Sequence, residues 1–262
     1  MAAPLHVDRL PDGVVLLRLD VPERRNAMTE ELTAAWGAAL PPLAADPTLR
    51  CVVVTGEGPA FCAGGDLSWL EESGAMTPDR LRARMLPFYR TWLAIRDLEV
   101  PTVAVVNGAA VGAGLALALA CDLRYAAPAA KLSMPFTSLG IHAGMASTWL
   151  LPEVAGLAVA REMLLTGRVV SAEEAVGLGL VNRTFPAESL REQALAVAST
   201  VATRAPIATR LTKLALASGG HASFDAALAW ESVAQPLTMA TADLQEGVRA
   251  ARERRPPRFT GH

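Results

Sequence analysis

The sequence has few residues of the kinds that crosslink a chain or bind metal ions. Among its 262 residues there are three cysteines, Cys51, Cys62 and Cys121, and four histidines. No two cysteines have the C-x-x-C spacing of zinc and redox sites, and no cluster of ligand side chains has metal-binding spacing. Each cysteine lies in or beside an apolar, strand-like run. We therefore expect three small buried hydrophobic residues and a reducing compartment.

An excess of charge of either sign is also lacking. The formal net charge is −2, which gives no overall attraction to nucleic acid or to an anionic membrane. The local exception is the arginine-rich stretch 249–258, which fits either a solvated helix end or a patch for coenzyme A phosphates. The N-terminal residues have no basic segment followed by an apolar run, so we expect no signal peptide and a cytoplasmic location.

One uncharged stretch is long enough to be tested as a membrane span. It runs between Glu99 and Asp122 and contains Pro101, Asn107 and three glycines. Its first half is β-branched and its second half is rich in alanine and leucine. This pattern favours a buried strand that enters a buried helix over a membrane span.

What the chain has in abundance is apolar sequence, which makes up 52% of its residues. Strand-like runs are predicted at 14–19, 50–55, 102–106, 123–126 and 131–134, and helices at 30–45, 78–96 and up to 120. Pro41 and Pro42 are expected to kink or break the first helix early. From about residue 147 the pattern is mainly helical. Alternation of strands and helices predicts an α/β fold with largely parallel strands.

Two glycine-rich turns are the most informative segments. Residues 61–67 read FCAGGDL and residues 107–114 read NGAAVGAG, each between a strand-like and a helix-like run. Such a turn leaves backbone N–H groups without partners at the positive end of a helix. Two turns in one chain predict paired donors for a single oxygen, an arrangement that stabilises an oxyanion or enolate. A dinucleotide site is disfavoured, because Leu117 occupies the third glycine position and no acidic residue follows at the expected distance.

With these turns the chain resembles the crotonase superfamily, the enoyl-CoA hydratase/isomerase family. Further segments resemble that family in the same order, over about residues 10–261. They are RRNAM at 24–28, ACDL at 120–123, LGI at 139–141, LLP at 150–152, LLTG at 164–167, AEEAVGLGLV at 172–181, QEGV at 245–248 and the C-terminal residues 255–261. The ordered set carries the resemblance, and no single motif does.

The resemblance implies a fold, a ligand and an assembly. The expected fold is α/β, a crotonase-like ββα superhelix with a C-terminal helical region. Residues 1–200 would form the crotonase core, and residues 201–262 a helical oligomerisation region for a homotrimer or a dimer of trimers. The expected partner is an acyl-CoA thioester, with no separate cofactor because coenzyme A is part of the substrate. No nucleic acid or membrane partner is expected.

The resemblance also assigns site residues. The two oxyanion donors would be the backbone N–H groups of Gly65 and Ala113. The family usually has glycine at the second position, and alanine keeps the N–H. Apolar side chains that could line the acyl pocket include Leu70, Met76, Met85 and Met145. The expected substrate-binding residues are Arg24, Arg25, Ala27, Ala63, Gly64, Asp66, Leu67, Trp69, Gly112 and Phe136; the two arginines suit coenzyme A phosphates.

The chain departs from the family at the residues that transfer protons. The two hydratase glutamate positions hold Ala116 and Phe136, and a carboxylate position used by some isomerases holds Gly144. None of these side chains can act as a general acid or base. Weak hydration of simple enoyl-CoA substrates is therefore predicted.

His142 is the candidate replacement. It lies in residues 140–144, GIHAG, which border the acyl site in the family, and histidine titrates near neutral pH. The alternative is a histidine whose ring bonds a backbone carbonyl or solvent. Asp66 is expected to cap the helix it opens and Asp122 to order a turn. Glu71, Glu72 and Glu153 are lesser candidates for the site.

Two functions remain open at this point. The chain is either an enzyme acting on a specialised acyl-CoA or a non-catalytic acyl-CoA-binding or carrier protein on the crotonase fold. In the enzyme, protons would move through His142, a substrate carboxylate or an ordered water. The missing carboxylates favour the carrier, and the two donor turns favour the enzyme.

Overall fold

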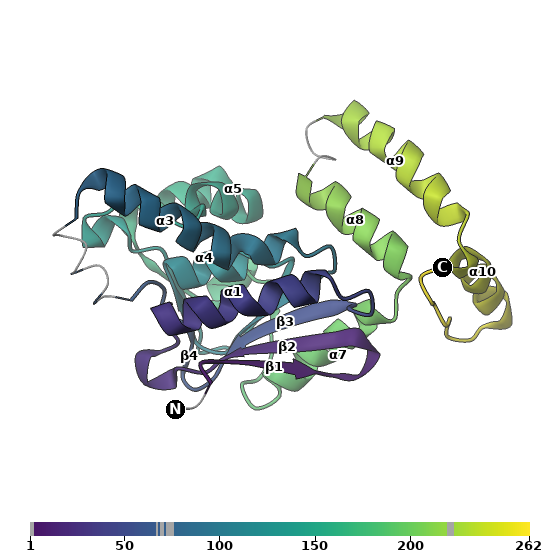
Figure 1. Cartoon of the computed structure of the whole chain (residues 1–262), viewed down its shortest axis with the longest axis horizontal. Helices are drawn as coiled ribbons and strands as arrows, with labels where there is room; N and C mark the ends of the chain where they lie inside the picture. The colour runs from purple at the N-terminus through teal and green to yellow at the C-terminus, as the bar shows by residue number, and fades with distance from the viewer. Residues whose placement is uncertain (1–2, 67, 69–70, 72–75, 219–222) are drawn as a thin grey trace.

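The strands form two sheets in a computed structural model that describes residues 3–66, 68, 71, 76–218 and 223–262 (Figure 1). The six-stranded sheet has the order β1 (Leu5–Arg9), β2 (Val14–Leu19), β3 (Cys51–Gly56), β5 (Thr102–Val106), β7 (Leu123–Ala126) and β10 (Arg183–Thr184). The second sheet has the order β4 (Ala60–Cys62), β6 (Ala109–Val111), β8 (Lys131–Ser133) and β9 (Val169–Ser171). All neighbours are parallel except β1 with β2 and β8 with β9. The predicted α/β class and parallel pairing are confirmed.

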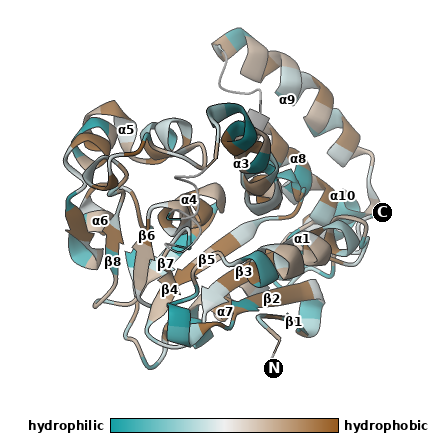
Figure 2. Ribbon diagram, turned by 60° about the vertical axis from the view of Figure 1, so that its left-hand side comes forward, coloured by the Kyte–Doolittle hydropathy of each residue, from teal (hydrophilic) through white to brown (hydrophobic). Residues whose placement is uncertain are grey.

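The six-stranded sheet is buried on both faces, which explains its continuous apolar strands. Alternate residues of β2 and β3 point to opposite sides. Val14, Leu16 and Val53 join one buried cluster with α7 (Leu190–Ala202). Val15, Leu17 and Val52 join the other, under α1 (Glu30–Ala44) and α3 (Pro78–Leu93) (Figures 1 and 2). A stacked pair of indole rings, Trp36 and Trp92, joins these two helices with centroids 5.0 Å apart.

Helix α1 is capped at its start and continues through two prolines near its end. Thr29 caps its start, because the Thr29 hydroxyl accepts the N–H of Leu32 at 3.2 Å. The expected early break at Pro41 and Pro42 is wrong, since the helix continues through both to Ala44. Leu40 and Leu43 are almost fully buried on either side of the prolines. Burial of these side chains outweighs the single hydrogen bond that a proline removes.

The second half of the chain is mainly helical, as predicted. The remaining helices are α4 (Ala113–Ala120), α5 (Ser147–Thr166), α6 (Ala172–Gly177), α8 (Pro206–Ser218), α9 (Phe224–Met239) and α10 (Ala242–Glu253), with 3-10 turns at Pro11–Gly13, Pro22–Arg24, Ala94–Asp97 and Thr137–Leu139. Helices α9 and α10 stand away from the sheets (Figure 1). Helix α8 is tied to the core by Lys213, whose ammonium lies 2.9 Å from Asp122 and 2.8 Å from the Val100 carbonyl. Asp122 also accepts the N–H of Thr102, so it joins three segments and does not merely order a turn.

Two arginines of the arginine-rich C-terminal stretch, Arg249 and Arg255, are paired within that part of the chain. Glu246 accepts hydrogen bonds from Arg249 and Arg255 and from the backbone N–H of Arg258. These donors hold the pKa of Glu246 far below its ordinary value. The cluster therefore fastens α10 to the terminal residues, and none of the arginines from 249 to 258 lines the large pocket described below.

The cysteines and the uncharged stretch are placed as the sequence predicts. Cys51, Cys62 and Cys121 are buried, and burial raises the pKa of each thiol to about 12. Strand β5 and helix α4 occupy the stretch between Glu99 and Asp122. Among the described residues, no helix has both the length and the apolar character needed to cross a membrane.

Candidate active site

The two glycine-rich turns meet in space. The first leaves β4 at Ala63, and the second leaves β6 and opens α4. Gly64 has a φ of +91°, and a Cβ at this position would lie 2.5 Å from the carbonyl oxygen of Val111 and 3.3 Å from the nitrogen of Ala113. Only glycine combines this backbone conformation with this close approach. Gly64 therefore sets the distance between the two predicted donor residues.

The N–H groups of Gly65 and Ala113 are both available. The bridge between the segment at 24–28 and the first turn uses the N–H of Met28 on the carbonyl of Gly64, at 2.8 Å. Within the described part of the chain, neither Gly65 nor Ala113 donates its N–H to a protein acceptor. Ala113 is the first residue of α4, and a Cβ on Gly65 would meet no atom within 4 Å. Both residues line the pocket described below, so two N–H groups without a protein acceptor border the same space.

Helix α4 is held rigidly behind the second donor. Every residue from Ala113 to Ala120 is buried. A Cβ at Gly114 would overlap the carbonyl oxygen of Cys62, so the first turn of α4 packs directly on β4. Position 114 accordingly needs glycine to keep the Ala113 N–H in place.

Asn26 fixes the segment that leads into the site. It is fully buried and has a φ of +54°. Its amide donates to the carbonyls of Glu57 and Ala60, and its side-chain oxygen accepts the N–H of Val21. The sequence gives no signal for this role beyond the RRNAM segment itself, because two of the three partners, Glu57 and Ala60, lie 31 and 34 residues further along the chain.

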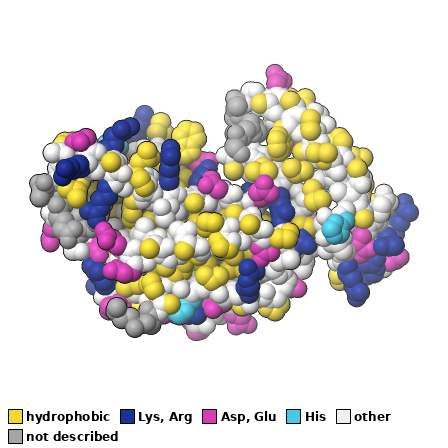
Figure 3. Space-filling view, viewed as in Figure 1, with side chains coloured by type: hydrophobic (Ala, Val, Ile, Leu, Met, Phe, Trp, Pro, Cys, Tyr) yellow, Lys and Arg dark blue, Asp and Glu magenta, His cyan; other side chains and the backbone are white. Residues whose placement is uncertain are grey.

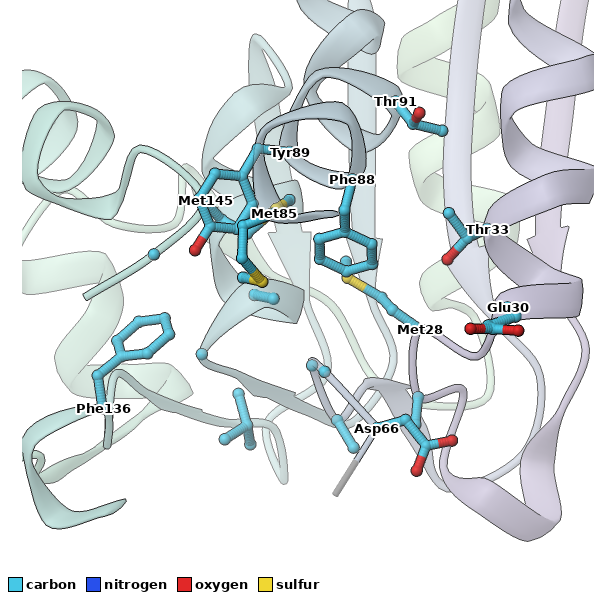
Figure 4. Close-up of a pocket in the computed structure, with 18 of the residues that line it drawn as sticks. Met28, Glu30, Thr33, Asp66, Met85, Phe88, Tyr89, Thr91, Phe136 and Met145 are labelled. Carbon is cyan, nitrogen blue, oxygen red and sulfur yellow. The ribbon is translucent and has the colours of Figure 1, made fainter. Parts of the chain in front are cut away.

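A pocket of about 960 Å³ opens in front of the donors (Figure 4). Its walls come from both turns, α1, α3 and the loop around residues 135–145. The described residues predicted as oxyanion donors, as substrate-binding residues or as the proton-transfer group line it, namely Arg24, Arg25, Ala27, Ala63, Gly64, Gly65, Asp66, Gly112, Ala113, Phe136 and His142. The predictions for Leu67, Trp69, Leu70 and Glu72 fall outside the described residues. Met76 is partly exposed and is not one of the lining residues.

One side of the pocket is apolar and the other is charged (Figure 4). Met85, Phe88, Phe136 and Met145 supply the apolar side, as predicted for all but Phe88. On the charged side Arg24 pairs with Asp66 at 2.5 Å, and Arg84 pairs with Glu30 at 2.7 Å. Asp66 also accepts the N–H of Ser68 at 3.0 Å, the bond expected of a capping residue.

Comparison with known proteins identifies the family of the chain. A family model described as enoyl-CoA hydratase/isomerase matches residues 9–262. The chain belongs to the enoyl-CoA hydratase/isomerase family. It is 36% identical to the 1,2-epoxyphenylacetyl-CoA isomerase of Escherichia coli, over 98% of this chain and 97% of that one. It is 32% identical to the mitochondrial methylglutaconyl-CoA hydratase of Mus musculus, over 98% and 82%.

A solved structure extends the match to three dimensions. The enoyl-CoA hydratase of Bacillus anthracis superposes with a TM-score of 0.93 and 34% identity, over 99% of this chain and all of that one. The fold is therefore the crotonase fold of the enoyl-CoA hydratase/isomerase family, including the C-terminal helices. Members of this family act on CoA thioesters.

The three positions at which we predicted a missing carboxylate have different surroundings. Ala116 is fully buried and does not line the pocket. The ring of Phe136 packs over Gly112, with its nearest atom 3.6 Å from the place of a Cβ there. At Gly144 a Cβ would lie 2.5 Å from the phenol oxygen of Tyr89. Aromatic side chains thus take up the space beside Gly112 and Gly144.

His142 lies on the pocket wall and is exposed. Its Nδ1 lies 2.7 Å from the carbonyl oxygen of Ala143, so Nδ1 is the donor in this contact. The other acidic candidates lie elsewhere. Glu153 pairs with Arg96 at 3.1 Å and is not a lining residue, and Glu71 is exposed outside the pocket.

Proposed function

We propose that this family member binds an acyl-CoA thioester in the 960 Å³ pocket and stabilises the enolate formed at the thioester carbonyl. The N–H groups of Gly65 and Ala113 would donate to the enolate oxygen. The observation that carries the proposal is the contact at Gly64, which brings the two turns together beside the pocket. Donors fixed in advance where negative charge develops are a major source of catalysis.

The two sides of the pocket suit the two ends of such a ligand. The charged side, with Arg24 and Arg25, would hold the coenzyme A phosphates, and Ala27, Ala63 and Gly112 would leave room for the thioester. The apolar side, with Phe136, would hold the acyl group. Coenzyme A would be part of the substrate, with no separate cofactor.

Titration calorimetry with butyryl-CoA tests the proposal. We expect butyryl-CoA to bind, and butyrate alone to bind far more weakly because it lacks the phosphates. Free coenzyme A should bind but should not respond to substitutions on the apolar side. A folded protein that takes up neither butyryl-CoA nor longer acyl-CoAs would contradict the proposal.

Hydration of crotonyl-CoA should be weak. Loss of one general acid or base costs about 10²–10⁴-fold in rate, and Ala116 and Phe136 replace both glutamates. The measurement is the loss of enoyl absorbance at saturating crotonyl-CoA, with an enzyme that has both glutamates as the reference. Turnover equal to that reference would show that another group of this chain substitutes fully for the glutamates.

The carrier alternative makes a different prediction for the same protein. Burial of Ala116 and the apolar contacts of Phe136 are the observations in its favour. A carrier would bind butyryl-CoA but would not exchange the protons on its α-carbon with solvent. An enolate-forming site would exchange them, and His142 is the sequence-predicted group for that transfer.

We also propose that the C-terminal helices assemble the chain into a homotrimer or a dimer of trimers. Support comes from the exposed apolar side chains on the projecting helices (Figure 3). They are Leu216 on α8 and Phe224, Leu228, Val233, Leu237 and Met239 on α9, with Phe224 81% exposed. A surface of this kind on a soluble chain marks an interface.

The assembly proposal predicts the effect of a charge on α9. Val233→Glu should lower the mass in solution from three or six chains to one, because it buries a charge in the interface. Light scattering measures this mass, and Val7→Glu on the edge strand β1 is the matched control, since Val7 is also exposed. A wild-type protein that is already monomeric would overturn the proposed assembly.

A further inference from the structure

Tyr89 brings an ionisable group into the apolar side of the pocket. It belongs to α3, where Met85, Phe88 and Tyr89 follow the spacing i, i+3 and i+4 and therefore share one face of the helix. All three line the pocket, and Figure 4 shows the Tyr89 phenol beside Met85 and Met145. Of the two tyrosines in the chain, the other, Tyr125, is buried on β7 and is not a lining residue.

The Tyr89 oxygen is held by the loop before α5. It lies 2.5 Å from the place of a Cβ at Gly144, so a larger residue there would displace the phenol. A backbone hydrogen bond from Met145 lowers the pKa of Tyr89, so the N–H of Met145 is the donor and would stabilise a phenolate. Within the described chain no acceptor takes up the phenol's own hydrogen, which leaves that hydrogen for a ligand.

The loop is shaped to present this N–H. Met145 and Ala146 both have positive φ values, +54° and +52°, which are unfavourable for residues other than glycine. The carbonyl of Gly144 accepts from both the N–H and the hydroxyl of Ser147, at 3.0 and 2.5 Å. These bonds hold the two residues in their strained conformation. The strained loop therefore brings the backbone of residues 144 and 145 close to the oxygen of Tyr89.

The charged groups of the pocket do not set the ionisation of Tyr89. Burial raises its pKa above the ordinary value of about 10, and the Met145 hydrogen bond opposes this rise. No charged side chain contributes to the shift. Asp66 and Glu30 lie on the opposite side of the pocket in Figure 4, each paired with an arginine. Among the described residues, the other titratable and charged groups that line the pocket are Glu23, Arg24 and Arg25 of the first loop, Glu30 of α1, Asp66, Arg84 of α3 and His142.

We propose that Tyr89 is a catalytic residue that carries the proton to and from the α-carbon of the bound acyl group. This role rests on the proposed enolate chemistry at Gly65 and Ala113. In the forward step the O–H bond of Tyr89 breaks, the electron pair of the enolate forms a C–H bond at the α-carbon, and the thioester carbonyl is restored. The phenolate that remains accepts the N–H of Met145. In the reverse step the phenolate takes the α-proton and the enolate reforms.

Exchange of α-protons with deuterium tests this role. Wild-type protein incubated with butyryl-CoA in heavy water should incorporate deuterium at the α-carbon, as measured by mass spectrometry. Tyr89→Phe keeps the ring and should lower the exchange rate by about 10²-fold or more, because it removes the general acid–base group. The affinity for butyryl-CoA should change only a few-fold. Tyr125→Phe, the same chemical change outside the pocket, should leave the exchange rate unaltered.

A second variant changes Gly144, the residue that the phenol oxygen of Tyr89 approaches. Gly144→Ala would place a methyl group against the phenol oxygen and displace it. We expect a loss of exchange comparable with that of Tyr89→Phe. In the double variant the two losses should not add, since both remove the same function.

The pH dependence separates tyrosine from histidine. Because the pKa of Tyr89 is raised, its phenolate fraction grows about tenfold per pH unit between about pH 7 and pH 9. The difference between the exchange rates of the wild type and Tyr89→Phe should grow by the same factor per pH unit. In Tyr125→Phe only one tyrosine remains, so its ultraviolet titration should report Tyr89 alone.

Each other outcome overturns the inference in a distinct way. Exchange that survives in Tyr89→Phe but falls in His142→Ala, with a midpoint near neutral pH, would assign the proton to His142. Binding of butyryl-CoA without exchange in wild-type protein would exclude proton transfer and leave the carrier function. Failure of butyryl-CoA to bind would overturn the proposed function, and the role of Tyr89 with it.

Discussion

Replacing Ala113 with proline is expected to lower the rate of α-proton exchange in butyryl-CoA by about 10²–10³-fold, the usual cost of one lost oxyanion donor. Proline has no backbone N–H, so the substitution removes the donor itself. Ala113 is the first residue of α4, the helix position at which proline is tolerated best. Gly112 precedes it, and glycine adapts to a following proline more readily than other residues. The fold should therefore survive the loss of the donor.

Ala113→Gly is the matched control for this prediction. It keeps the N–H, removes only a methyl group and should leave the exchange rate within a few-fold of wild type. Circular dichroism and the melting temperature of all three proteins would show that the helix persists. Equal exchange in Ala113→Pro and wild type would mean that the Ala113 N–H does not contact the enolate.

Replacing Gly114 with alanine should produce a large loss of stability. The added methyl group would overlap the carbonyl oxygen of Cys62, a rigid backbone atom of β4. Helix α4 is buried along its whole length and cannot shift without disturbing the core. Overpacking of this kind costs about 1–3 kcal/mol. For a chain of this size each kcal/mol lowers the melting temperature by about 2–4 °C.

Gly177→Ala is the control for the Gly114 substitution. Gly177 lies in helix α6, and a Cβ there would meet no atom within 4 Å. Its replacement should leave the melting temperature unchanged or raise it slightly, because alanine reduces the entropy of the unfolded chain. A Gly114→Ala protein with the same melting temperature as the wild type would show that α4 and β4 are not in the close contact described above.

Much of the fold could be predicted from local sequence patterns. The long apolar strands β2, β3 and β5 and the two glycine turns have strong patterns, so their positions follow from the sequence. Strands β4, β6 and β9 have only three residues each, too few for any periodicity to appear. They exist because their neighbours pair with them. The early break expected at Pro41 and Pro42 did not occur for a similar reason, since packing in the core outweighs a local preference.

The site residues also fall into two groups, those that local motifs predict and those that depend on tertiary packing. The turns, the RRNAM segment and Phe136 were predicted because they belong to continuous motifs, and the described ones line one pocket. Tyr89 and Phe88 could not be predicted for the pocket. They lie on a helix whose approach to the loop at 144–146 depends on the tertiary packing of α3. Asn26 was missed because its carbonyl partners, Glu57 and Ala60, lie 31 and 34 residues further along the chain.

The infrared frequency of the bound thioester carbonyl tests the paired donors most directly. Butyryl-CoA with an isotope-labelled carbonyl would be measured free, bound to wild type and bound to Ala113→Pro. We predict that binding to wild type lowers the stretching frequency below that of the free thioester in water, because two fixed N–H groups polarise the bond in a shielded site. In Ala113→Pro most of this frequency shift should be lost. A bound carbonyl whose frequency equals that of the free thioester would contradict the assignment of Gly65 and Ala113 as oxyanion donors.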